Sequence, residues 1–476
     1  MMLAMLGMAV GTGNIWRFPR IAASNGGGSF LVAWVVFLLL WSIPLILVEF
    51  AMGRETRYGP IGAFARLAGP RFAWMGAWIA WTATAIMFYY TVVMGWTIRY
   101  FWASLSGELS GAEPGGVWDS FAWGGSVLWY HALAMALAAW VVARGVKGIE
   151  RASSFLIPSL FVLVVVLTIR AVTLPGASEG LNFLFTPTLE GLKDHRVWLN
   201  ALTQNAWDTG AGWGLILTYA IYMRRREDTA LNAFMLGFGN NSVSLLAGIL
   251  VLCTVFSIMP DAASEIVGAG NEGLTFIWVP QLFNAMPAGR LFMTLFFLAL
   301  VFAAWSSLIS MIELATRVLV DGGLDRRRAL VLVAVAGFAL GVPSALSEAW
   351  FQNQDWVWGV GLMVSGLFYA LAVLRYGVTR FRENLINTED SDIRIGWWWD
   401  VAIRLVVVQA VILVVWWIAQ FGTGEPWGRY GIWTTLVQWG VVIAMFLALN
   451  RWMIRRTHPE TAREEAPEGA MPPSIP

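Results

Sequence analysis

The sequence LGMAVGTGN at residues 6–14 and the sequence QNAWDTGAGWG at residues 204–214 each place three glycines among polar residues inside an otherwise apolar stretch. Backbone that leaves the helical conformation inside a bilayer is tolerated only where its free N–H and C=O groups line a cavity or bind something. The two segments therefore predict two membrane helices that are interrupted beside a binding site. Close helix packing through glycine is the alternative explanation.

The composition predicts a membrane protein. Of the 476 residues, 58% are hydrophobic and 13% are charged, and this charged share is about half that of an ordinary soluble domain. A soluble fold cannot bury so many apolar side chains, since too much of its surface faces water. The 31 basic and 30 acidic residues nearly cancel, so the basic surface typical of nucleic-acid binding is not expected. Composition therefore excludes a soluble enzyme, a disordered chain and a nucleic-acid-binding protein.

Apolar stretches recur along the chain at the length that one bilayer crossing requires, about 20 residues. Twelve spans are expected, at residues 1–24, 29–53, 72–105, 124–143, 150–171, 196–223, 230–257, 291–320, 326–343, 353–376, 398–420 and 432–454. The breaks fall in the first and sixth spans, which are equivalent positions if the first five spans repeat as the next five. That arrangement is typical of inverted-repeat transporters with a midplane site. We therefore expect an all-α polytopic fold with repeats at residues 1–171 and 172–376 and two further spans at residues 377–456.

The loops predict an orientation in the membrane. Basic clusters such as Arg144, Lys147 and Arg151, or Arg326–Arg328, follow the even-numbered spans, whereas the other loops are mostly acidic or neutral. Cytoplasmic loops are enriched in Lys and Arg, so we expect a multi-pass protein of the plasma (inner) membrane with both termini in the cytoplasm. The Pro-rich, polar residues 457–476 are expected to form a disordered cytoplasmic tail.

Asp208 lies within the second break, and a carboxylate at membrane depth is costly and usually functional. Free carbonyl oxygens at a break can coordinate a cation such as Na+, and free N–H groups at a half-helix N-terminus can hold a carboxylate. The paired breaks thus suit a zwitterionic solute and its coupling ion together. The single cysteine and three scattered histidines predict neither a disulfide nor a metal cluster. The nucleophile–base pair of an intramembrane enzyme is not visible either.

Further motifs continue outward from the first break. They are AVGTGNIWRFP at residues 9–19, NGGG at 25–28, EFAMGR at 49–54, KGIER at 147–151, GLNF at 180–183, TY at 218–219 and SS at 306–307. In this order, over nearly the whole chain, they resemble the neurotransmitter:sodium symporter family with its LeuT-type 5+5 inverted-repeat fold. The resemblance implies a sodium-coupled symporter that imports a small zwitterionic solute by alternating access. It implies no enzymatic activity and no obligatory protein partner besides the lipid bilayer.

The resemblance also implies two sodium sites. Sodium site one would comprise Ala9, Asn14, Asp208 and Asn240, together with the carboxylate of the substrate. Sodium site two would comprise Gly7, Val10, Ala303, Ser306 and Ser307. Taken alone, the two asparagines suit interhelical hydrogen bonding equally well, and the two serines suit hydrogen bonds within their own helix.

A substrate site and two gates are implied in the same way. The substrate-binding residues would be Ala9, Thr12, Gly13, Ile86, Tyr90, Val93, Trp207, Asp208, Gly210, Trp213, Ser307 and Met311. Arg17 and Asp355 resemble an outer gate, a charge pair that closes above the substrate with Tyr90 and Trp207. Asp321 with Tyr219 and Tyr222 resembles an inner gate. Taken alone, the aromatic residues suit ordinary packing, and an exposed charge pair contributes only about 0–1 kcal/mol.

Two departures from the family pattern concern chloride. Trp34 stands where chloride-dependent members place a tyrosine ligand of the ion, and Ser244 stands where chloride-independent bacterial members often place a glutamate. Asp208 replaces the usual serine or threonine close by. We therefore expect its carboxylate to supply the fixed negative charge, because two unit charges ~4 Å apart interact by about 4 kcal/mol at an effective dielectric constant of about 20. Transport is expected to be independent of chloride, and proton antiport through Asp208 is an open alternative.

Gly11 occupies the position at which biogenic-amine members carry an aspartate for the ammonium group of the ligand. A solute with its own carboxylate is therefore expected, most simply a small neutral amino acid. Trp213 narrows the pocket, whereas Gly210 reopens some room, so its net size stays open. Betaine, taurine or creatine-like osmolytes are alternatives, as is a non-transporting or channel-like protein of the same fold. The chain begins inside the first span, so we expect the true start to lie upstream. The family's basic partner for the inner-gate aspartate is absent, and Asp321 is expected to lack a partner.

Overall fold

The computed structural model describes residues 1–111, 113–224, 226–389, 391–421 and 425–457, and within these residues it contains helices and no strand. The longer helices are α3 (Gly28–Phe37), α4 (Ile43–Thr56), α6 (Ala73–Ser106), α8 (Val127–Ala143), α9 (Gly145–Val172), α12 (His195–Asp208), α14 (Thr229–Ile258), α18 (Gly289–Asp321), α19 (Arg326–Leu346), α20 (Glu348–Tyr376), α22 (Trp398–Phe421) and α23 (Ile432–Thr457).

Shorter helices connect these elements or complete the broken spans. They are α1 (Met2–Ala9), η1 (Gly13–Arg17), α2 (Phe18–Ser24), η2 (Leu38–Ser42), α5 (Pro60–Leu67), η3 (Pro70–Phe72), α7 (Pro114–Phe121), α10 (Ala177–Phe185), α11 (Leu189–Lys193), α13 (Leu215–Ala220), η4 (Pro260–Ala262), α15 (Ala263–Gly268), α16 (Gly270–Glu272), η5 (Gly273–Trp278), α17 (Val279–Asn284), α21 (Val378–Phe381) and η6 (Arg382–Ile386). Thr457 ends α23, and the rest of the expected disordered tail lies outside the described residues.

The helices agree with the twelve expected spans. Within the described ranges, nine helical segments are long and apolar enough to cross a bilayer. They are Gly28–Thr56, Pro70–Ser106, Gly145–Val172, Thr229–Ile258, Gly289–Asp321, Arg326–Leu346, Glu348–Tyr376, Trp398–Gln420 and Ile432–Thr457. The shorter apolar helix α8 and the two broken spans, α1 to α2 and α12 to α13, complete the set.

Both predicted breaks are confirmed. Val10 follows α1 with φ −77° and ψ 90°, outside the helical region, and helical structure resumes at Gly13. In the second break, Gly210, Gly212 and Gly214 have φ values of 70°, 89° and 79°. Residues with a Cβ rarely adopt positive φ. These glycines therefore permit the backbone to leave α12 at Asp208 and to begin a new helix, α13.

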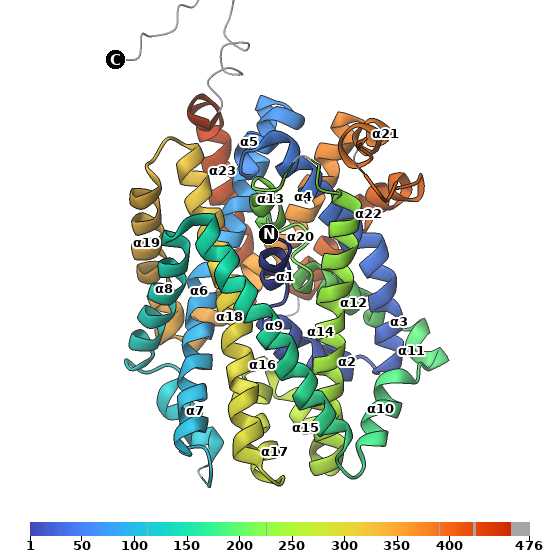
Figure 1. Cartoon of the computed structure of the whole chain (residues 1–476), viewed down its shortest axis with the longest axis vertical. Coiled ribbons are helices and arrows are strands. Elements are labelled where there is room, and N and C mark those ends of the chain that lie inside the picture. Colours follow the sequence, from blue (N-terminus) through green and yellow to red (C-terminus); the bar gives the residue numbers. More distant parts are fainter. Residues whose placement is uncertain (112, 225, 390, 422–424, 458–476) are drawn as a thin grey trace, which may run out of the picture.

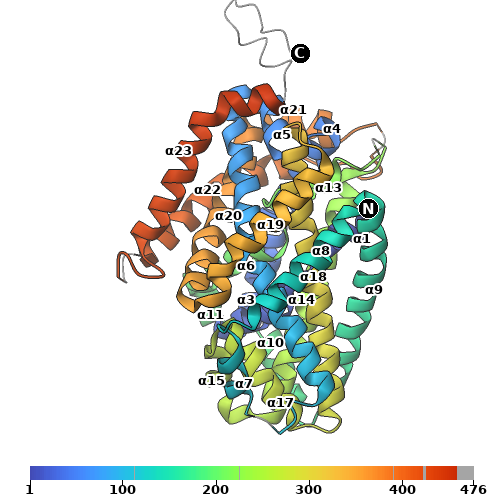
Figure 2. The same ribbon diagram turned by 90° about the vertical axis from the view of Figure 1, so that its left-hand side faces the viewer.

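The breaks lie inside the helix bundle. α6 packs against α18, α8 and α20, and the short α1 lies among α9, α14 and α18 (Figure 1). Figure 2 shows α23 on the outside of the molecule, on the side away from α9. In α22 and α23 only 28% and 17% of the most apolar segment is buried. The remaining apolar side chains of these helices therefore suit contact with lipid.

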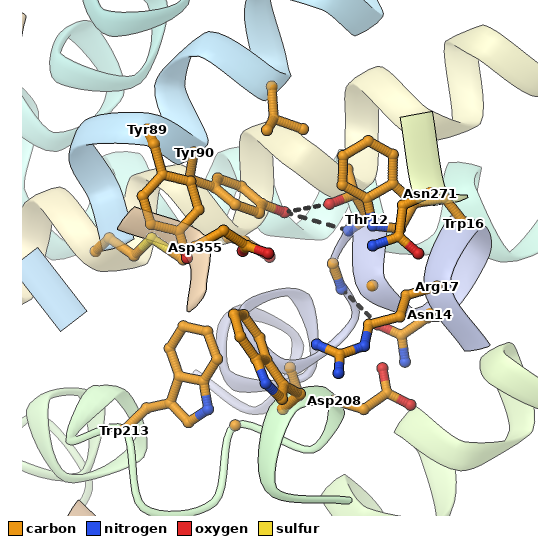
Figure 3. A pocket seen from close by; sticks show the side chains of 18 of the residues that line it. Thr12, Asn14, Trp16, Arg17, Tyr89, Tyr90, Asp208, Trp213, Asn271 and Asp355 are labelled. Atoms are coloured by element: carbon orange, nitrogen blue, oxygen red, sulfur yellow. Dashed lines mark hydrogen bonds between the residues drawn. The ribbon is translucent and has the colours of Figure 1, made fainter. Parts of the chain in front are cut away.

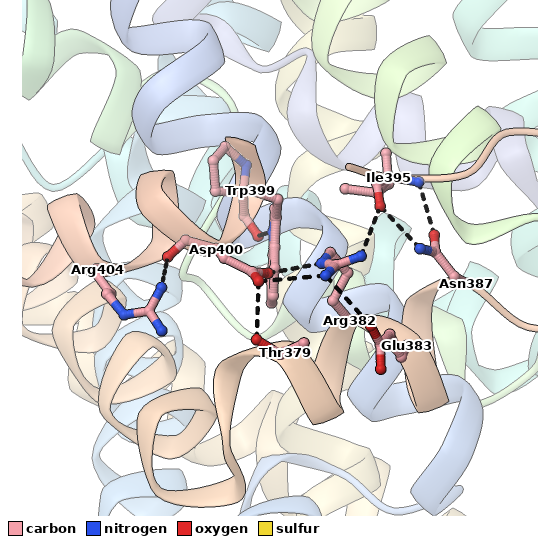
Figure 4. A network of polar contacts seen from close by, with 9 residues as sticks. Thr379, Arg382, Glu383, Asn387, Ile395, Trp399, Asp400 and Arg404 are labelled. Carbon is pink, nitrogen blue, oxygen red and sulfur yellow. Dashed lines mark hydrogen bonds and ion pairs between the residues drawn. The ribbon is translucent and has the colours of Figure 1, made fainter. Parts of the chain in front are cut away.

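The segment that connects α20 to α22 is held by Asp400, the third residue of α22 (Figure 4). Nε of Arg382 donates to Oδ1 of Asp400 over 2.8 Å, and Oγ1 of Thr379 donates to Oδ2 over 3.0 Å. Nδ2 of Asn387 donates to the carbonyl of Ile395 over 2.9 Å. These bonds fold α21 and η6 back against the first turn of α22.

Candidate functional site

A cavity of about 80 Å³ lies between the two breaks, and Figure 3 shows side chains from several helices around it. The predicted substrate-site residues that line this cavity are Ala9, Thr12, Gly13, Tyr90, Val93, Trp207, Asp208, Gly210, Trp213, Ser307 and Met311. Ile86 is fully buried in the hydrophobic core and is not among the lining residues. The structure thus brings together all but one of the residues that the family resemblance implied.

Tyr90 reaches from α6 to the first break. The backbone N–H and the Oγ1 hydroxyl of Thr12 each donate to Oη of Tyr90 over 3.2 Å (Figure 3). A Cβ placed on Gly11 would lie 3.1 Å from this Oη and 2.9 Å from Oγ of Ser307. A side chain at position 11 would therefore have to displace the Ser307 hydroxyl. This part of the cavity presents hydroxyl and amide groups, which can donate to a carboxylate.

Asn14 connects the first break to α14 and, through α14, to the second break. Its Oδ1 accepts from the N–H of Gly11 over 2.7 Å. Its Nδ2 donates to Oδ1 of Asn240 over 2.9 Å and to Oγ of Ser244 over 2.7 Å. Oγ of Ser244 in turn donates to Oδ2 of Asp208 over 2.8 Å. The three predicted polar residues of sodium site one therefore belong to a single buried cluster, defined here as the Asn14 cluster (Asn14, Asn240, Ser244 and Asp208).

The second carboxylate oxygen of Asp208, Oδ1, is buried and has no hydrogen-bond partner among the residues that the structure describes. A Cβ placed on Gly13 would lie 3.7 Å from it, so this oxygen faces the first break. Gln204, one turn earlier in α12, is buried, and neither of its side-chain polar atoms meets a well-oriented hydrogen-bond partner within the described residues. Sequence reasoning missed Gln204, although a polar residue inside a span is itself a signal.

The oxygens of this region suit a hard cation. Unpaired carboxylate and backbone oxygens are the ligands that such cations prefer. In the described part of the chain, no group of three or more His, Cys, Asp or Glu side chains could hold a metal ion. A mostly neutral set of oxygens with one carboxylate therefore fits an ion of single charge, such as Na+.

The predicted residues of sodium site two lie where α1 passes α18. Oγ of Ser307 donates to the carbonyl of Met8 over 3.3 Å, from one helix to the other. Oγ of Ser306 donates instead to the carbonyl of Ala303 over 3.0 Å, within its own helix. A Cβ placed on Gly7 would lie 3.2 Å from Cβ of Ser306, so glycine allows the two helices to come close. Because the Ser306 hydroxyl donates its hydrogen to that carbonyl, the lone pairs of its oxygen remain free to ligate a cation.

Arg17 and Asp355 both line the cavity. The guanidinium group of Arg17 lies over the ring of Trp207, 4.7 Å from its centroid. Figure 3 shows Asp355 beside Tyr89. The direct charge pair expected of a closed outer gate stays a prediction.

A larger cavity of about 680 Å³ adjoins the first one. Three of the residues predicted for the outer gate line both cavities, namely Arg17, Trp207 and Asp355. Glu272 in α16 also lines both cavities, and burial raises its pKa to about 7. Nε of Arg20 donates to Oδ1 of Asn271 over 2.7 Å and so ties α2 to α16. The residues predicted for the outer gate therefore lie between a small inner cavity and a wide vestibule.

The expectation that Asp321 lacks a partner is wrong. Nε of Arg317, one turn earlier in α18, lies 2.7 Å from Oδ1 of Asp321. The backbone N–H of Gly59 donates to Oδ2 over 2.7 Å, and Nη2 of Arg317 donates to the carbonyl of Arg57 over 3.2 Å. α18 thus supplies the basic residue itself, because a pair spaced i, i+4 meets on one face of a helix.

The two tyrosines predicted for the inner gate form hydrogen bonds with α18. Oη of Tyr219 lies 2.8 Å from Oγ of Ser310, and Oη of Tyr222 donates to Oε1 of Glu313 over 2.8 Å. Glu313 is fully buried, and its Oε2 lies 2.6 Å from Nη2 of Arg326 in α19. Sequence reasoning missed Glu313, although an acidic residue inside a span is a functional signal.

Glu49 holds the second break in place. Its Oε1 accepts from the N–H of Gly212 over 2.7 Å, and its Oε2 accepts from the N–H of Leu217 over 3.1 Å. The side chain is fully buried in α4. A carboxylate makes stronger hydrogen bonds than a neutral acceptor, so Glu49 compensates backbone donors that the break and the start of α13 leave free.

Comparisons with known proteins agree with this geometry. The family model described as the sodium:neurotransmitter symporter family matches residues 1–122 and 115–459. An uncharacterized sodium-dependent transporter of Methanocaldococcus jannaschii is 31% identical and covers 93% of this chain and 93% of its own. The uncharacterized sodium-dependent transporter YhdH of Bacillus subtilis is 32% identical, over 87% of this chain and 94% of its own.

A solved structure is similar to this one over most of its length. The crystal structure of MhsT in complex with L-phenylalanine matches with a TM-score of 0.77 and 30% identity, over 87% of this chain and 97% of the other. This match confirms the LeuT-type fold. Together with the family model it shows a multi-pass, sodium-dependent membrane transporter rather than an enzyme. The chain belongs to the sodium:neurotransmitter symporter family.

Proposed function

We propose that this transporter imports a small neutral amino acid as a zwitterion, together with Na+ and without chloride. The observation that carries the proposal is the Asn14 cluster, which joins the two breaks beside the cavity. A solute carboxylate and a cation bound side by side there attract each other. Each therefore raises the affinity of the protein for the other, and this reciprocity is the thermodynamic basis of coupling.

The walls of the cavity support a small side chain. Trp207 and Trp213 meet edge to face with ring centroids 6.0 Å apart, and Met311 lines the same space. MhsT was solved with L-phenylalanine, which supports the amino-acid class. The cavity of about 80 Å³ favours a smaller member of that class. Gly11, where a side chain would collide with Ser307 and Tyr90, favours a solute that brings its own carboxylate.

Two sodium sites are proposed. Site one comprises Ala9, Asn14, Asp208, Asn240 and the carboxylate of the solute, and site two comprises Gly7, Val10, Ala303, Ser306 and Ser307. An elementary charge that crosses a potential of 100 mV contributes about 2.3 kcal/mol. Two sodium ions per solute would double that figure, which supports concentrative uptake.

Chloride independence is supported by the position of Asp208. Its carboxylate accepts from Ser244, so a fixed negative charge adjoins the Asn14 amide without a bound anion. Trp34, at the position of the tyrosine ligand in chloride-dependent members, packs against Phe18 with ring centroids 4.6 Å apart. Trp34 therefore contributes an aromatic ring to the hydrophobic core beside Phe18.

Alternating access would move the bundle that contains both breaks against the remaining scaffold. The two five-span repeats, residues 1–171 and 172–376, would supply matching halves of each part. The outer gate of Arg17 and Asp355 closes when the solute bridges the breaks, and the Asp321 region opens on the other side. Both termini face the cytoplasm in this proposal, as the basic loops indicate.

Uptake into proteoliposomes tests the proposal. A thermal-shift screen of amino acids and osmolytes in Na+ and in choline first identifies the solute, because a ligand that binds the folded state stabilises it. Radiolabelled solute should then accumulate only under an inward sodium gradient, with chloride replaced by gluconate. Equilibration without accumulation would indicate a channel, and binding without movement would indicate a non-transporting protein; either result overturns the proposal. Stabilisation by a betaine and by no amino acid would overturn the substrate class.

A further inference from the structure

A groove of about 640 Å³ opens at the corner where α8 meets α9, outside the transport site. Its lining combines three cations with apolar side chains. The cations are Arg144, Lys147 and Arg151, and the larger apolar residues are Trp140, Phe155, Leu156 and Trp305. Figure 2 shows this corner on the outer surface of the bundle.

The three cations are available for an external anion. Each of them is exposed, and none forms an ion pair with an acidic residue in the described part of the chain. Glu150 is the only acidic residue between positions 144 and 151, and it does not line the groove. The guanidinium group of Arg144 stacks on the ring of Trp140 at 3.6 Å, which fixes the cation at the rim of the groove.

The apolar part of the groove continues along a face that has no protein cover. Trp140 is 52% exposed and Phe155 is 63% exposed. Farther along α9, Val162, Val166 and Ile169 are also exposed, and only 39% of the most apolar segment of this helix is buried. A ligand that places a charged group on the cations can therefore extend a long apolar chain along α9.

The indole N–H of Trp305 is a second, independent indication that the groove binds a ligand. Its indole Nε1 is buried and has no hydrogen-bond acceptor among the described residues, and the side chain lines the groove from α18. A buried donor without an acceptor destabilises the folded state. A phosphate or ester oxygen in the groove would provide that acceptor.

We propose that this groove binds an anionic glycerophospholipid of the surrounding bilayer, with its phosphate on Arg144, Lys147 and Arg151 and its acyl chains along the exposed face of α9. Basic pockets between transmembrane helices favour lipids of this charge. The aromatic pair at the rim, Trp140 and Phe155, suits the boundary between headgroups and hydrocarbon, where aromatic residues are enriched. α9 packs against α1 and α18, so the bound lipid stabilises the helix that supports the first break.

Native mass spectrometry of the purified full chain tests the proposal. The probes are phosphatidylglycerol and phosphatidylcholine with identical acyl chains, added to the same neutral detergent. The wild type should bind phosphatidylglycerol more tightly. The triple variant R144Q/K147Q/R151Q should lose about fivefold in affinity per removed cation, because each basic residue near an anionic lipid contributes about 1 kcal/mol.

A matched control removes the same charge elsewhere. R451Q/R455Q/R456Q neutralises three exposed arginines at the end of α23 and should keep the affinity for phosphatidylglycerol. Unchanged affinity in the groove variant would overturn the proposal, as would equal binding of both lipids. Full competition by inorganic phosphate would also overturn it, since that result identifies a site for a free anion.

If the triple variant fails to fold, a second variant tests the same lipid site. Trp305→Phe retains an aromatic ring and removes the indole donor, so it should weaken phosphatidylglycerol binding several-fold. Its elution on size exclusion in phosphatidylcholine reports whether it folds. Unchanged affinity for phosphatidylglycerol in folded Trp305→Phe would then overturn the proposal.

Discussion

Oγ of Ser244 donates a hydrogen bond of 2.8 Å to Oδ2 of Asp208. This contact links the middle of α14 to the residue at which α12 ends, and Asn14 donates to the same Ser244 from the first break. A carboxylate, a hydroxyl and an amide are thus held together below the surface of the bundle. The residues around this contact are therefore the ones whose substitution should most affect ion and solute binding.

Asp208→Ser should make transport depend on chloride. The substitution removes the carboxylate and leaves hydroxyl and amide groups that can donate to an anion in its place. We expect wild-type uptake to be equal in chloride and in gluconate, whereas uptake by Asp208→Ser should rise about tenfold in chloride, a change that corresponds to 1.4 kcal/mol. Asp261→Asn, an exposed position in η4, serves as the charge control. A wild type that is inactive without chloride would contradict the assignment.

Asn14→Ala should weaken sodium binding. The amide contacts Gly11, Asn240 and Ser244, and its oxygen is a proposed ligand of site one. Loss of one ligand oxygen and its hydrogen bonds should lower sodium affinity about tenfold or more, since each net hydrogen bond contributes about 0.5–1.5 kcal/mol. Sodium titration of substrate binding measures this change, with Asn284→Ala in α17 as the control. An unchanged sodium affinity would remove Asn14 from the site.

Gly11→Ala and Gly13→Ala should differ sharply. A Cβ at position 11 would lie 2.9 Å from Oγ of Ser307 and 3.1 Å from Oη of Tyr90, whereas a Cβ at position 13 would meet only Asp208 Oδ1 at 3.7 Å. Gly11→Ala should therefore reduce substrate affinity at least about fivefold, because overpacking costs about 1–3 kcal/mol. Gly13→Ala should retain most of the affinity. Isothermal titration in saturating Na+ measures the substrate affinity of both variants. Equal effects would show that the contacts with Ser307 and Tyr90 do not restrict position 11.

Glu49→Ala should destabilise the second break. The carboxylate accepts from Gly212 and Leu217, and hydrogen bonds to a charged group contribute about 1.5–3 kcal/mol each. We expect a large fall in Tm, a smaller fall for Glu49→Gln, and almost none for Glu55→Ala, an exposed residue of the same helix. Thermal unfolding in detergent gives the order of the three variants. A Glu49→Ala variant as stable as Glu55→Ala would show that the break needs no such acceptor.

Glu272 should make stability fall as the pH rises. Burial raises its pKa from the ordinary 4.5 to about 7, so the folded state binds more protons than the unfolded state between these values. Its contribution is therefore fully present below about pH 4.5 and is lost as the pH rises through about 7. The groups that influence it are Arg20, Asp355 and Glu348. Glu272→Gln should flatten the dependence of Tm on pH, whereas Glu265→Gln, exposed on α15, should leave it unchanged.

The breaks and the spans could be predicted because their causes are local. Three glycines within five residues permit the positive φ values found at Gly210, Gly212 and Gly214, and uninterrupted apolar runs of bilayer length form helices in lipid. The family motifs then indicated the residues of the cavity, and all but Ile86 line it.

The partners of the buried charges could not be predicted in this way. Glu49 bonds to Gly212 across 163 positions, and Asp321 bonds to Gly59 across 262. Arg317 pairs with Asp321 within one helix, but the spacing alone does not show that this pair faces a loop between other spans. Such contacts depend on how the helices are rotated and packed.

The sequence by itself determined where the chain crosses the membrane, where two crossings are interrupted and which residue types surround the interruptions. Hydrophobic length and glycine conformation act over a few residues, so they can be read from the chain. Only the tertiary structure decided that Glu49 compensates the second break, that Arg17 lies on Trp207, and that three cations share a groove with Trp305. These relationships arise because packing brings distant side chains within hydrogen-bonding and stacking distance.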